Sequence, residues 1–380
     1  MRSRRLLLIT RNLPPLRGGM ERLNARMALE LSKRFDVEVI GPPGCAAFVD
    51  ADVVVHEAPS SNVALFLLWA SWKAGVVALM RRPAWILGGS GLVAPIVRMA
   101  AVLSRGRTAV YLHGLDIVVA HPLYQALWVP SIRRIHQCFC NSRATAALAV
   151  SSGIESGKIE TIFPGVDTTR LPPSGQFGYR HGIADRKIML SVGRLTRRKG
   201  LDLFIEKAMP SIVSRVPNAM LVIIGDDAPN ALAAGPKGMR ERIQELVDRM
   251  HLSAHVVMLG PVSERELHDA YASSDTHVFP VRDVPGDVEG FGMVAIEAAA
   301  QGLPTVAFAV GGVTDAVKEG CSGHLVVADD YVAFAESVVS LLQSERGKME
   351  ASCISFAQNF AWPKFGERLA NALDAHEGHV

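Results

Sequence analysis

In this chain of 380 residues, the most informative segment contains two glutamates, Glu289 and Glu297. Glu289 lies in the stretch Asp-Val-Glu-Gly-Phe-Gly, and Glu297 follows eight positions later among small and apolar residues that predict a helix. An unpaired carboxylate is costly to bury, so such an acid should have a partner or a ligand. Eight helical residues would span roughly 12 Å, whereas the paired acids of a retaining glycosidase lie about 5 Å apart. The spacing suits two acids on one extended ligand, one on sugar hydroxyls and one on a nucleotide ribose.

A second candidate site is a cationic turn. Arg194, Arg197, Arg198 and Lys199 follow the predicted strand 188–192 and precede a predicted helix. Arginine can hold a diphosphate with two hydrogen bonds, and lysine can act on it as a point charge. A solvated basic turn is the plain alternative. The position at the carboxyl end of a strand favours anion binding.

A glycine pair and a histidine also follow predicted strands. Gly18 and Gly19 open a predicted helix, where free N–H groups could receive a phosphate. A tight strand-to-helix turn explains the pair equally well, and the pattern is not the Gly-x-Gly-x-x-Gly of nicotinamide sites. His113 ends another predicted strand in Tyr-Leu-His-Gly, and its residue type alone favours a structural role.

Short apolar runs alternate with helical patterns along the whole chain, which predicts an α/β protein. Met20, Leu23, Met27 and Leu31 form one helical stripe, and Ser263 with Glu266 forms a capping box. The Pro- and Gly-rich stretch 164–175 predicts a linker between two doubly wound domains, with ligands at the carboxyl ends of the strands and a site between the domains. Strands are predicted at 6–10, 37–40, 53–56, 85–87, 109–113, 138–141, 188–192, 220–224, 256–259, 277–279 and 305–308.

Composition excludes several classes of protein. The chain is 49% hydrophobic and 20% charged, so it is neither disordered nor a small binding module. Five scattered cysteines favour a reducing compartment, and the first apolar run is too short for a signal peptide. The apolar stretch 63–80 predicts a buried helix rather than a membrane span, because it carries Ser71, Lys73 and Gly75. We therefore expect a cytoplasmic protein.

The charge is divided unevenly along the chain. Residues 1–170 hold 20 Lys and Arg against 11 Asp and Glu, whereas residues 171–380 hold 20 against 26. A basic first half predicts an anionic partner, either phosphates or a membrane surface. No nucleic-acid motif is present and the basic residues are not interleaved with aromatic ones, so no nucleic-acid partner is expected. Asp50-Ala51-Asp52 precedes a strand and predicts a solvated loop rather than a metal site.

The two glutamates in their Glu-Gly-Phe-Gly setting, with the Gly-Arg-x-x-x-x-Lys-Gly turn, resemble family-four glycosyltransferases of the GT-B fold. These are retaining enzymes that use nucleotide-diphosphate sugars. The resemblance implies two Rossmann-like domains across a cleft: residues 1–168 for the acceptor, residues 169–360 for the donor, and a helix 361–376 that packs back onto the first domain. It implies no cofactor and no metal, because fixed cations and helix dipoles stabilise the leaving diphosphate.

The resemblance also assigns roles to residues. It places Glu289 on the transferred sugar, Glu297 on the ribose, Arg194 and Lys199 on the diphosphate, and His113 over the donor sugar. Gly18 and Gly19 correspond to a diphosphate loop. The remaining donor-binding positions implied are Gly290, Phe291, Gly292, Met293 and Val294. The family implies front-face retention, in which the departing phosphate oxygen accepts the acceptor's proton, and the sequence identifies no side-chain nucleophile.

The sequence also suggests a substrate class. The segments around Glu289 and at 310–317 are most similar to mannosyltransferases that use GDP-mannose or a GDP-deoxyhexose such as D-rhamnose. This implies a lipid-linked saccharide acceptor in O-antigen or polysaccharide synthesis and peripheral attachment to the inner face of the cytoplasmic membrane, with Arg81, Arg82, Arg105 and Arg107 as candidate contacts. A sugar-nucleotide 2-epimerase and a non-catalytic sugar-nucleotide-binding subunit remain alternatives.

Overall fold

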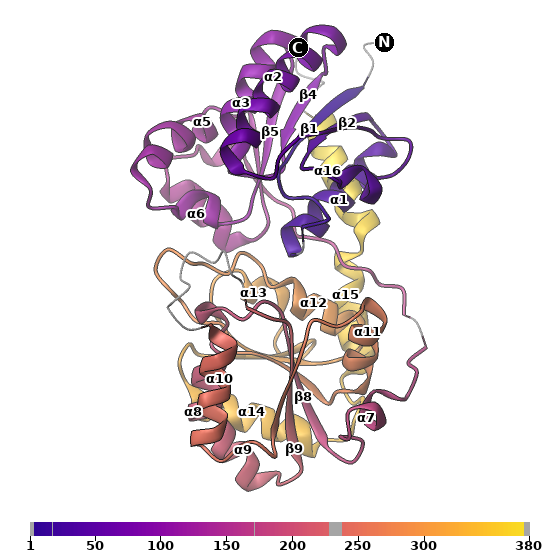
Figure 1. Cartoon of the computed structure of the whole chain (residues 1–380), viewed down its shortest axis with the longest axis vertical. Helices are drawn as coiled ribbons and strands as arrows, with labels where there is room; N and C mark the ends of the chain where they lie inside the picture. Colours follow the sequence, from indigo (N-terminus) through magenta and orange to yellow (C-terminus); the bar gives the residue numbers. More distant parts are fainter. Residues whose placement is uncertain (1–3, 17, 171, 228–237, 376–380) are drawn as a thin grey trace. The chain divides into compact units, whose positions relative to one another are not determined.

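A computed structural model describes residues 4–16, 18–170, 172–227 and 238–375 (Figure 1). The chain divides into two compact units. Unit 1 comprises Met1–Gly165 with Trp362–Val380, and unit 2 comprises Val166–Ala361. The first boundary thus falls at Gly165, a few residues before the one expected at residue 168.

Unit 1 is built on a parallel sheet of seven strands in the order β3-β2-β1-β4-β5-β6-β7. Its strands are β1 (Arg5–Ile9), β2 (Asp36–Gly41), β3 (Val54–Glu57), β4 (Trp85–Gly88), β5 (Arg107–Leu112), β6 (Gln137–Cys140) and β7 (Ile159–Thr161). The side chains of β4 and β6 are buried throughout, as expected of strands covered on both faces. The predicted strands are confirmed to within two residues, and only the short, half-buried edge strand β7 was not predicted.

Helices cover this sheet, and they are α1 (Gly19–Ser32), α2 (Val63–Arg81), α3 (Ala94–Ser104), α4 (Leu115–Val118), α5 (Val129–Arg133), α6 (Arg143–Ser151) and α16 (Trp362–Ala375). The stripe predicted on α1 is confirmed, because Leu23, Met27 and Leu31 are buried. The last helix, α16, lies along α1 in the same unit (Figure 1). Trp362 packs so closely on Gly165 that a Cβ there would meet its ring at 2.2 Å.

The prediction of a buried helix at 63–80 is half wrong. The helix forms as α2 and packs along α3, but only 28% of its most apolar window is buried. Phe66, Ala70 and Ala74 face the core, whereas Leu68 is 71% exposed and Trp72 63% exposed. By length and composition alone α2 could cross a membrane, yet its buried side chains are part of the unit 1 core. Apolar residues lie on nearly every side of α2, so the sequence did not show which side of the helix would be buried.

Unit 2 repeats the architecture with a parallel sheet of six strands in the order β10-β9-β8-β11-β12-β13. The strands are β8 (Lys187–Val192), β9 (Ala219–Ile224), β10 (Val256–Gly260), β11 (Thr276–Phe279), β12 (Thr305–Phe308) and β13 (Gly323–Val326). Only β13, which begins with Gly-His, was not predicted. Two parallel sheets of this order confirm the predicted fold class of two doubly wound α/β domains.

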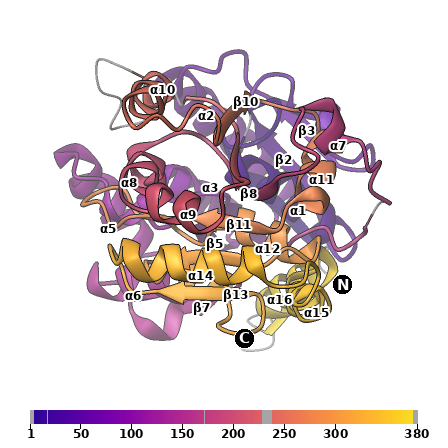
Figure 2. The ribbon, with the colours of Figure 1, turned by 90° about the horizontal axis from the view of Figure 1, so that it is seen from below.

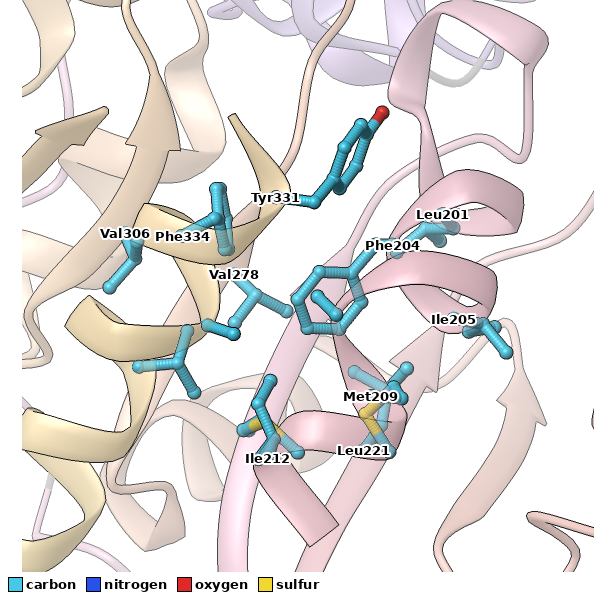
Figure 3. Close-up of a cluster of buried hydrophobic side chains, with 14 of the residues drawn as sticks. Leu201, Phe204, Ile205, Met209, Ile212, Leu221, Val278, Val306, Tyr331 and Phe334 are labelled. Atoms are coloured by element: carbon cyan, nitrogen blue, oxygen red, sulfur yellow. The ribbon is translucent and has the colours of Figure 1, made fainter. Parts of the chain in front are cut away.

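The helices of unit 2 are α7 (Phe177–Arg180), α8 (Leu201–Lys207), α9 (Met209–Arg215), α10 (Met239–Arg249), α11 (Glu264–Ser273), α12 (Met293–Ala300), α13 (Val313–Ala316), α14 (Tyr331–Gln343) and α15 (Glu350–Ala357). Helix α14 lies along one face of the sheet (Figure 2). Tyr331 and Phe334 of this helix join Phe204 of α8 in a buried apolar cluster (Figure 3).

The capping box predicted for α11 forms in part. The Ser263 side chain accepts a hydrogen bond from the Glu266 N–H at 3.2 Å. The Glu266 carboxylate instead lies 3.0 Å from Nε2 of His181 at the end of α7. A tertiary contact with His181 therefore takes the place of the local return bond.

Candidate functional site

The cationic turn of unit 2 is held in place by two glycines. Residues Arg197–Lys199 form a single 3-10 turn after β8, and Gly200 then starts α8 with φ at +68°. A Cβ on Gly200 would lie 2.1 Å from the carbonyl oxygen of Pro280, which follows β11. Gly193, with φ at +134°, lets the chain leave β8. The turn is thereby fixed at the carboxyl ends of β8 and β11.

A mostly buried charge cluster joins this turn to the first glutamate. Lys199 Nζ lies 2.9 Å from Glu289 Oε2, and Arg198 Nε lies 3.5 Å from the same oxygen. Arg198 Nη1 also donates to the Val288 carbonyl at 2.8 Å and to Asp287 Oδ1 at 3.2 Å. Only 16% of the Lys199 side chain and 12% of the Glu289 side chain are exposed. Arg198 thus anchors the loop that carries Glu289.

Burial and charge act against each other on this pair. Burial alone would raise the pKa of Glu289, but the nearby Lys199 and Arg198 outweigh it and hold the pKa below its ordinary value. Burial lowers the pKa of Lys199, and Glu289 opposes that shift. Glu289 is therefore an ionised carboxylate whose charge depends on its cationic neighbours.

The backbone around Glu289 is fixed by Gly312, a glycine of the turn before α13. Gly312 N–H donates to the Glu289 carbonyl at 3.1 Å. A Cβ on Gly312 would lie 2.0 Å from the Gly290 carbonyl oxygen, so only glycine allows this approach. The chain between Asp287 and Gly290 is therefore held on one side by Arg198 and on the other by the turn before α13.

Helix α12 starts immediately after this loop. Gly292, with φ at +94°, precedes it, and Phe291 is buried. The first N–H groups of a helix, here those of Met293 and Val294, have no partner within the helix, and the helix dipole favours an anion there. Because α12 begins only at Met293, the eight residues from Glu289 to Glu297 are not all helical. The continuous helix on which the estimate of roughly 12 Å rested is therefore absent, and the estimate loses its basis.

Glu297 and Arg194 lie near the same cluster. Glu297 sits half-buried on α12, where Tyr271 O–H donates to its Oε2 at 3.4 Å. Arg194 is exposed, and its charge contributes to lowering the pKa of Glu289. It borders the same small cavity as Lys199. Unit 2 thus brings Arg194, Lys199 and Glu289 together, and Glu297 is reached through Tyr271.

In unit 1, Gly18 and Gly19 stand at the start of α1, as the sequence suggested. The first turn of α1 carries a buried acid, Glu21, whose Oε1 accepts a hydrogen bond from Asn12 Nδ2 at 3.0 Å. A Cβ on Gly18 would meet Glu21 Oε2 at 2.3 Å. The carboxylate therefore occupies part of the space beside this helix start, so the diphosphate role of the two glycines stays a prediction.

His113 follows β5 with only 8% exposure. Its Nε2 lies 2.9 Å from the Gly89 carbonyl oxygen, which can only accept, so Nε2 carries the hydrogen. Nδ1 faces away from this carbonyl contact and can accept a hydrogen bond when it carries no hydrogen. The His113 backbone N–H donates to Asp116 Oδ2 at 2.8 Å, which holds the loop after β5. His113 is thus oriented by two contacts that sequence reasoning did not find.

Three residues near the site were missed as individual participants. Arg198 was counted only as one cation of the turn, and neither Tyr271 nor Asp116 was singled out. The signal for Arg198 was its place beside Lys199, but its bond to the Val288 carbonyl depends on tertiary structure. Tyr271 lies 26 positions before Glu297, a separation at which no local pattern predicts a contact.

Within the described ranges no three His, Cys, Asp or Glu side chains lie close enough to hold a metal ion. Asp50 and Asp52 belong to an exposed loop before β3, where Asp50 Oδ1 accepts from the Asp52 N–H at 3.2 Å. This observation does not test the expectation that the protein needs no metal, which stays a prediction.

Comparison with known proteins places this geometry in a family. Residues 17–170 match the family described as Glycosyltransferase Family 4, and residues 180–360 match Glycosyl transferases group 1. Sucrose-phosphate synthase from Thermosynechococcus elongatus superposes with a TM-score of 0.80 at 19% identity, covering 100% of both chains. Two successive glycosyltransferase family models thus match most of the chain, and its two units have the GT-B fold.

Named proteins share parts of this sequence. A GDP-mannose-dependent alpha-(1-6)-phosphatidylinositol monomannoside mannosyltransferase from Mycolicibacterium smegmatis is 32% identical over 244 residues, 61% of this chain. The chain spans 60% of the length of that relative. The protein of the same description from Mycobacterium tuberculosis is 28% identical over 89% of each chain.

The Lys199–Glu289 pair can be tested through stability. We expect Lys199→Met to lower the free energy of unfolding at pH 7 by about 3 kcal/mol, because it leaves a buried carboxylate without its nearest partner. The double variant Lys199→Met/Glu289→Gln should be less destabilised than the sum of the single variants. The measurement is urea unfolding of all four proteins.

The same pair predicts a pH dependence. Because the pKa of Glu289 is lower in the folded state than its ordinary 4.5, the contribution of the pair is complete above that value and is lost as the pH falls through the folded pKa. The deficit of Lys199→Met against wild type should therefore shrink as the pH falls below 4.5. A deficit that is independent of pH, with additive single variants, would contradict the ion pair.

Proposed function

We propose that this glycosyltransferase is a retaining enzyme that moves a hexose of the mannose or D-rhamnose type from a GDP-linked sugar to a lipid-linked saccharide in O-antigen or other polysaccharide synthesis. The observation that carries the donor site is the cluster of Arg198, Lys199 and Glu289 next to the start of α12. Cations and a helix N-terminus at the carboxyl ends of parallel strands suit a sugar diphosphate.

The proposed chemistry uses these groups in distinct roles. The bond between the anomeric carbon and the diphosphate oxygen breaks, and Arg194 and Lys199 stabilise the charge that develops on the departing diphosphate. Glu289 binds hydroxyls of the transferred sugar, and Glu297 binds the ribose. The departing oxygen accepts the proton of the acceptor hydroxyl, and the new bond forms on the same face. His113 offers Nδ1 as an acceptor for a sugar hydroxyl.

Two names among the relatives support the substrate class. They describe GDP-mannose-dependent enzymes that act on a phosphatidylinositol mannoside, which is a lipid that already carries a sugar. A solved relative in fold, Anabaena HepE, was crystallised with UDP and glucose; it is 18% identical, with a TM-score of 0.79 over 98% of this chain and all of that one. The two mannosyltransferases support a GDP-linked donor. The HepE structure with UDP shows that the same fold also binds another nucleotide.

A panel of nucleotide sugars tests the donor. We expect GDP-mannose or GDP-D-rhamnose to raise the melting temperature more than UDP, ADP or dTDP sugars, since a ligand at a hundred times its Kd stabilises by about 2.7 kcal/mol. Arg194→Ala/Lys199→Ala should abolish the shift and slow sugar transfer by 2 to 4 kcal/mol in activation free energy, roughly the loss of charge-stabilising contacts. Arg197→Ala, an exposed residue of the same turn, is the matched control.

Two outcomes of the panel would argue against the proposal. Full transfer activity in the double variant would remove the diphosphate role. Turnover of UDP-GlcNAc without any acceptor would instead support a 2-epimerase, and binding without any turnover would support a non-catalytic subunit. Activity that is lost with a chelator and restored by Mg²⁺ would overturn the expectation of a metal-independent enzyme.

The two glutamates should respond differently. Glu297→Ala should weaken the binding of GDP and of the GDP-sugar by the same factor, because both ligands carry the ribose. Glu289→Gln should lower kcat while GDP affinity changes little, because its partner on the ligand is the sugar. Isothermal titration and initial rates give both numbers, and the opposite pattern would mean that the two roles are exchanged.

We also propose that unit 1 attaches the enzyme reversibly to an anionic membrane. Leu65, Leu68, Trp72 and Leu79 recur on one side of α2 and are more than half exposed. Arg81, Arg82 and Arg105 are exposed at the ends of α2 and α3, although Arg81 Nε also lies 3.2 Å from Glu38 Oε1. Arg107 is half-buried and thus a weaker candidate. Apolar side chains beside cations suit the surface of an anionic bilayer.

Vesicle flotation tests the attachment. We expect binding to anionic vesicles at low salt and release as salt shortens the Debye length to about 3 Å at 1 M. Replacing the four arginines with Ser should weaken binding, since each nearby cation contributes about 1 kcal/mol, and Leu68→Ser/Trp72→Ser should weaken it separately. Val327→Ser/Val332→Ser, which removes two exposed apolar side chains of unit 2, is the control. Equal recovery with neutral vesicles would exclude the electrostatic contribution.

A further inference from the structure

Three buried aromatic rings form a column beneath the charge cluster of unit 2. His277 and Phe279 are alternate residues of β11, so they face the same side of the sheet, and their ring centroids lie 5.7 Å apart in a stacked arrangement. Tyr271, on α11, contacts His277 edge-on at 6.4 Å. All three side chains are at least 95% buried. We call Tyr271, His277 and Phe279 the aromatic column.

One end of the column contacts the proposed diphosphate lysine. Lys199 Nζ lies 4.5 Å from the centroid of the Phe279 ring, a distance at which the ring face attracts a cation. The ring itself is held by the loop before α12, because a Cβ on Gly292 would lie 2.8 Å from Phe279 Cε1. The ammonium of Lys199 is thereby placed by a ring as well as by the Glu289 carboxylate.

The other end of the column contacts the proposed ribose glutamate. Tyr271 O–H donates to Glu297 Oε2 at 3.4 Å. The carboxylate sits on α12, one turn into the helix whose start is packed against Phe279. The two ends of the column therefore meet the two side chains that would bind the diphosphate and the ribose.

The middle of the column is an uncharged ring. Burial, aided by the charge of Lys199, lowers the pKa of His277 to about 3, so the imidazole is neutral at any working pH. Its Nδ1 lies 3.1 Å from Thr305 Oγ1 on β12. His277 Nε2 is buried without a hydrogen-bond partner in the described part of the chain. The histidine thus serves as a packed ring between its two neighbours.

We infer that the aromatic column is a positioning device that sets Lys199 and Glu297 in register, so that diphosphate and ribose are bound as one rigid unit. The inference rests on the proposed nucleoside-diphosphate site and adds residues that do not touch the ligand. Tyr271 acts through the Glu297 carboxylate and Phe279 acts through the Lys199 ammonium, so each end of the column has its own chemical readout.

The test compares three ligands by isothermal titration: GDP, 2′,3′-dideoxy-GDP and inorganic pyrophosphate. Tyr271→Phe removes one hydroxyl and should weaken GDP by roughly three- to tenfold while leaving the dideoxy nucleotide and pyrophosphate unchanged, because only the ribose hydroxyls meet Glu297. Phe279→Leu should instead weaken all three ligands by a similar factor, because all carry the diphosphate. Phe279→Met serves as a second variant if Phe279→Leu does not fold.

Matched controls come from the other core of unit 2. Tyr331 and Phe334 are buried aromatic residues of α14 (Figure 3). Lys207 Nζ lies 5.0 Å from the centroid of the Tyr331 ring. Tyr331→Phe and Phe334→Leu therefore repeat the two types of substitution, and a lysine–ring contact, on residues outside the aromatic column. Both should change the three affinities by less than twofold, whatever they do to the melting temperature.

The outcomes separate this inference from the proposed function. If Tyr271→Phe weakens GDP and dideoxy-GDP equally, or changes neither, the column does not position Glu297. If Phe279→Leu and Phe279→Met leave pyrophosphate binding intact, it does not position Lys199. If the wild-type protein binds no nucleoside diphosphate of any base, the proposed function is wrong, and the positioning role of the column, which rests on it, is rejected as well.

Discussion

The geometry of unit 2 depends on one requirement, that a carboxylate and an ammonium largely removed from water stay within reach of each other. Two such ions lose several kcal/mol of hydration each, and only close, well-directed contacts compensate for that loss. Lys199 and Glu289 lie 90 positions apart, so their 2.9 Å contact needs both of the loops that carry them to be fixed. The loop of Lys199 is fixed by the approach of Gly200 to Pro280, and the loop of Glu289 by Gly312 and Arg198. The ion pair therefore depends on the close backbone approaches that these glycines allow.

The sequence predicts the fold better than it predicts these contacts. Strands such as β8 and β12 are short apolar runs, and a run that is buried on both faces is visible from local composition alone. The edge strands β7 and β13 were not predicted, because Ile-Glu-Thr and Gly-His-Leu-Val are too short and too mixed to form a pattern. Helix α2 shows that a clear apolar pattern can also mislead about burial. Its residues are apolar nearly all round, but tertiary structure covers only the side with Phe66, Ala70 and Ala74.

The same limit applies to the site. Arg194, Lys199, Glu289 and Glu297 could be identified because each has a distinctive neighbourhood in the sequence. The closeness of Arg194, Lys199 and Glu289 follows from strands that end at one edge of the sheet. The bond from Arg198 to the Val288 carbonyl, and that from Tyr271 to Glu297, join segments that no periodicity relates. A pattern can identify the groups that carry charge. The groups that hold them in position emerge only from packing.

A lysine over an aromatic ring does not by itself make a binding site, as the two clusters of unit 2 show. Lys207 lies over Tyr331 at 5.0 Å, nearly the distance from Lys199 to Phe279. What differs is the surroundings of the ammonium. Lys199 also meets a mostly buried carboxylate at the carboxyl ends of two strands, close to the start of a helix. There the ring can hold the ammonium without neutralising it, because a quadrupole attracts a cation but leaves its charge in place. An aromatic support therefore suits a lysine whose charge is needed by a ligand, whereas a second carboxylate in its place would cancel that charge.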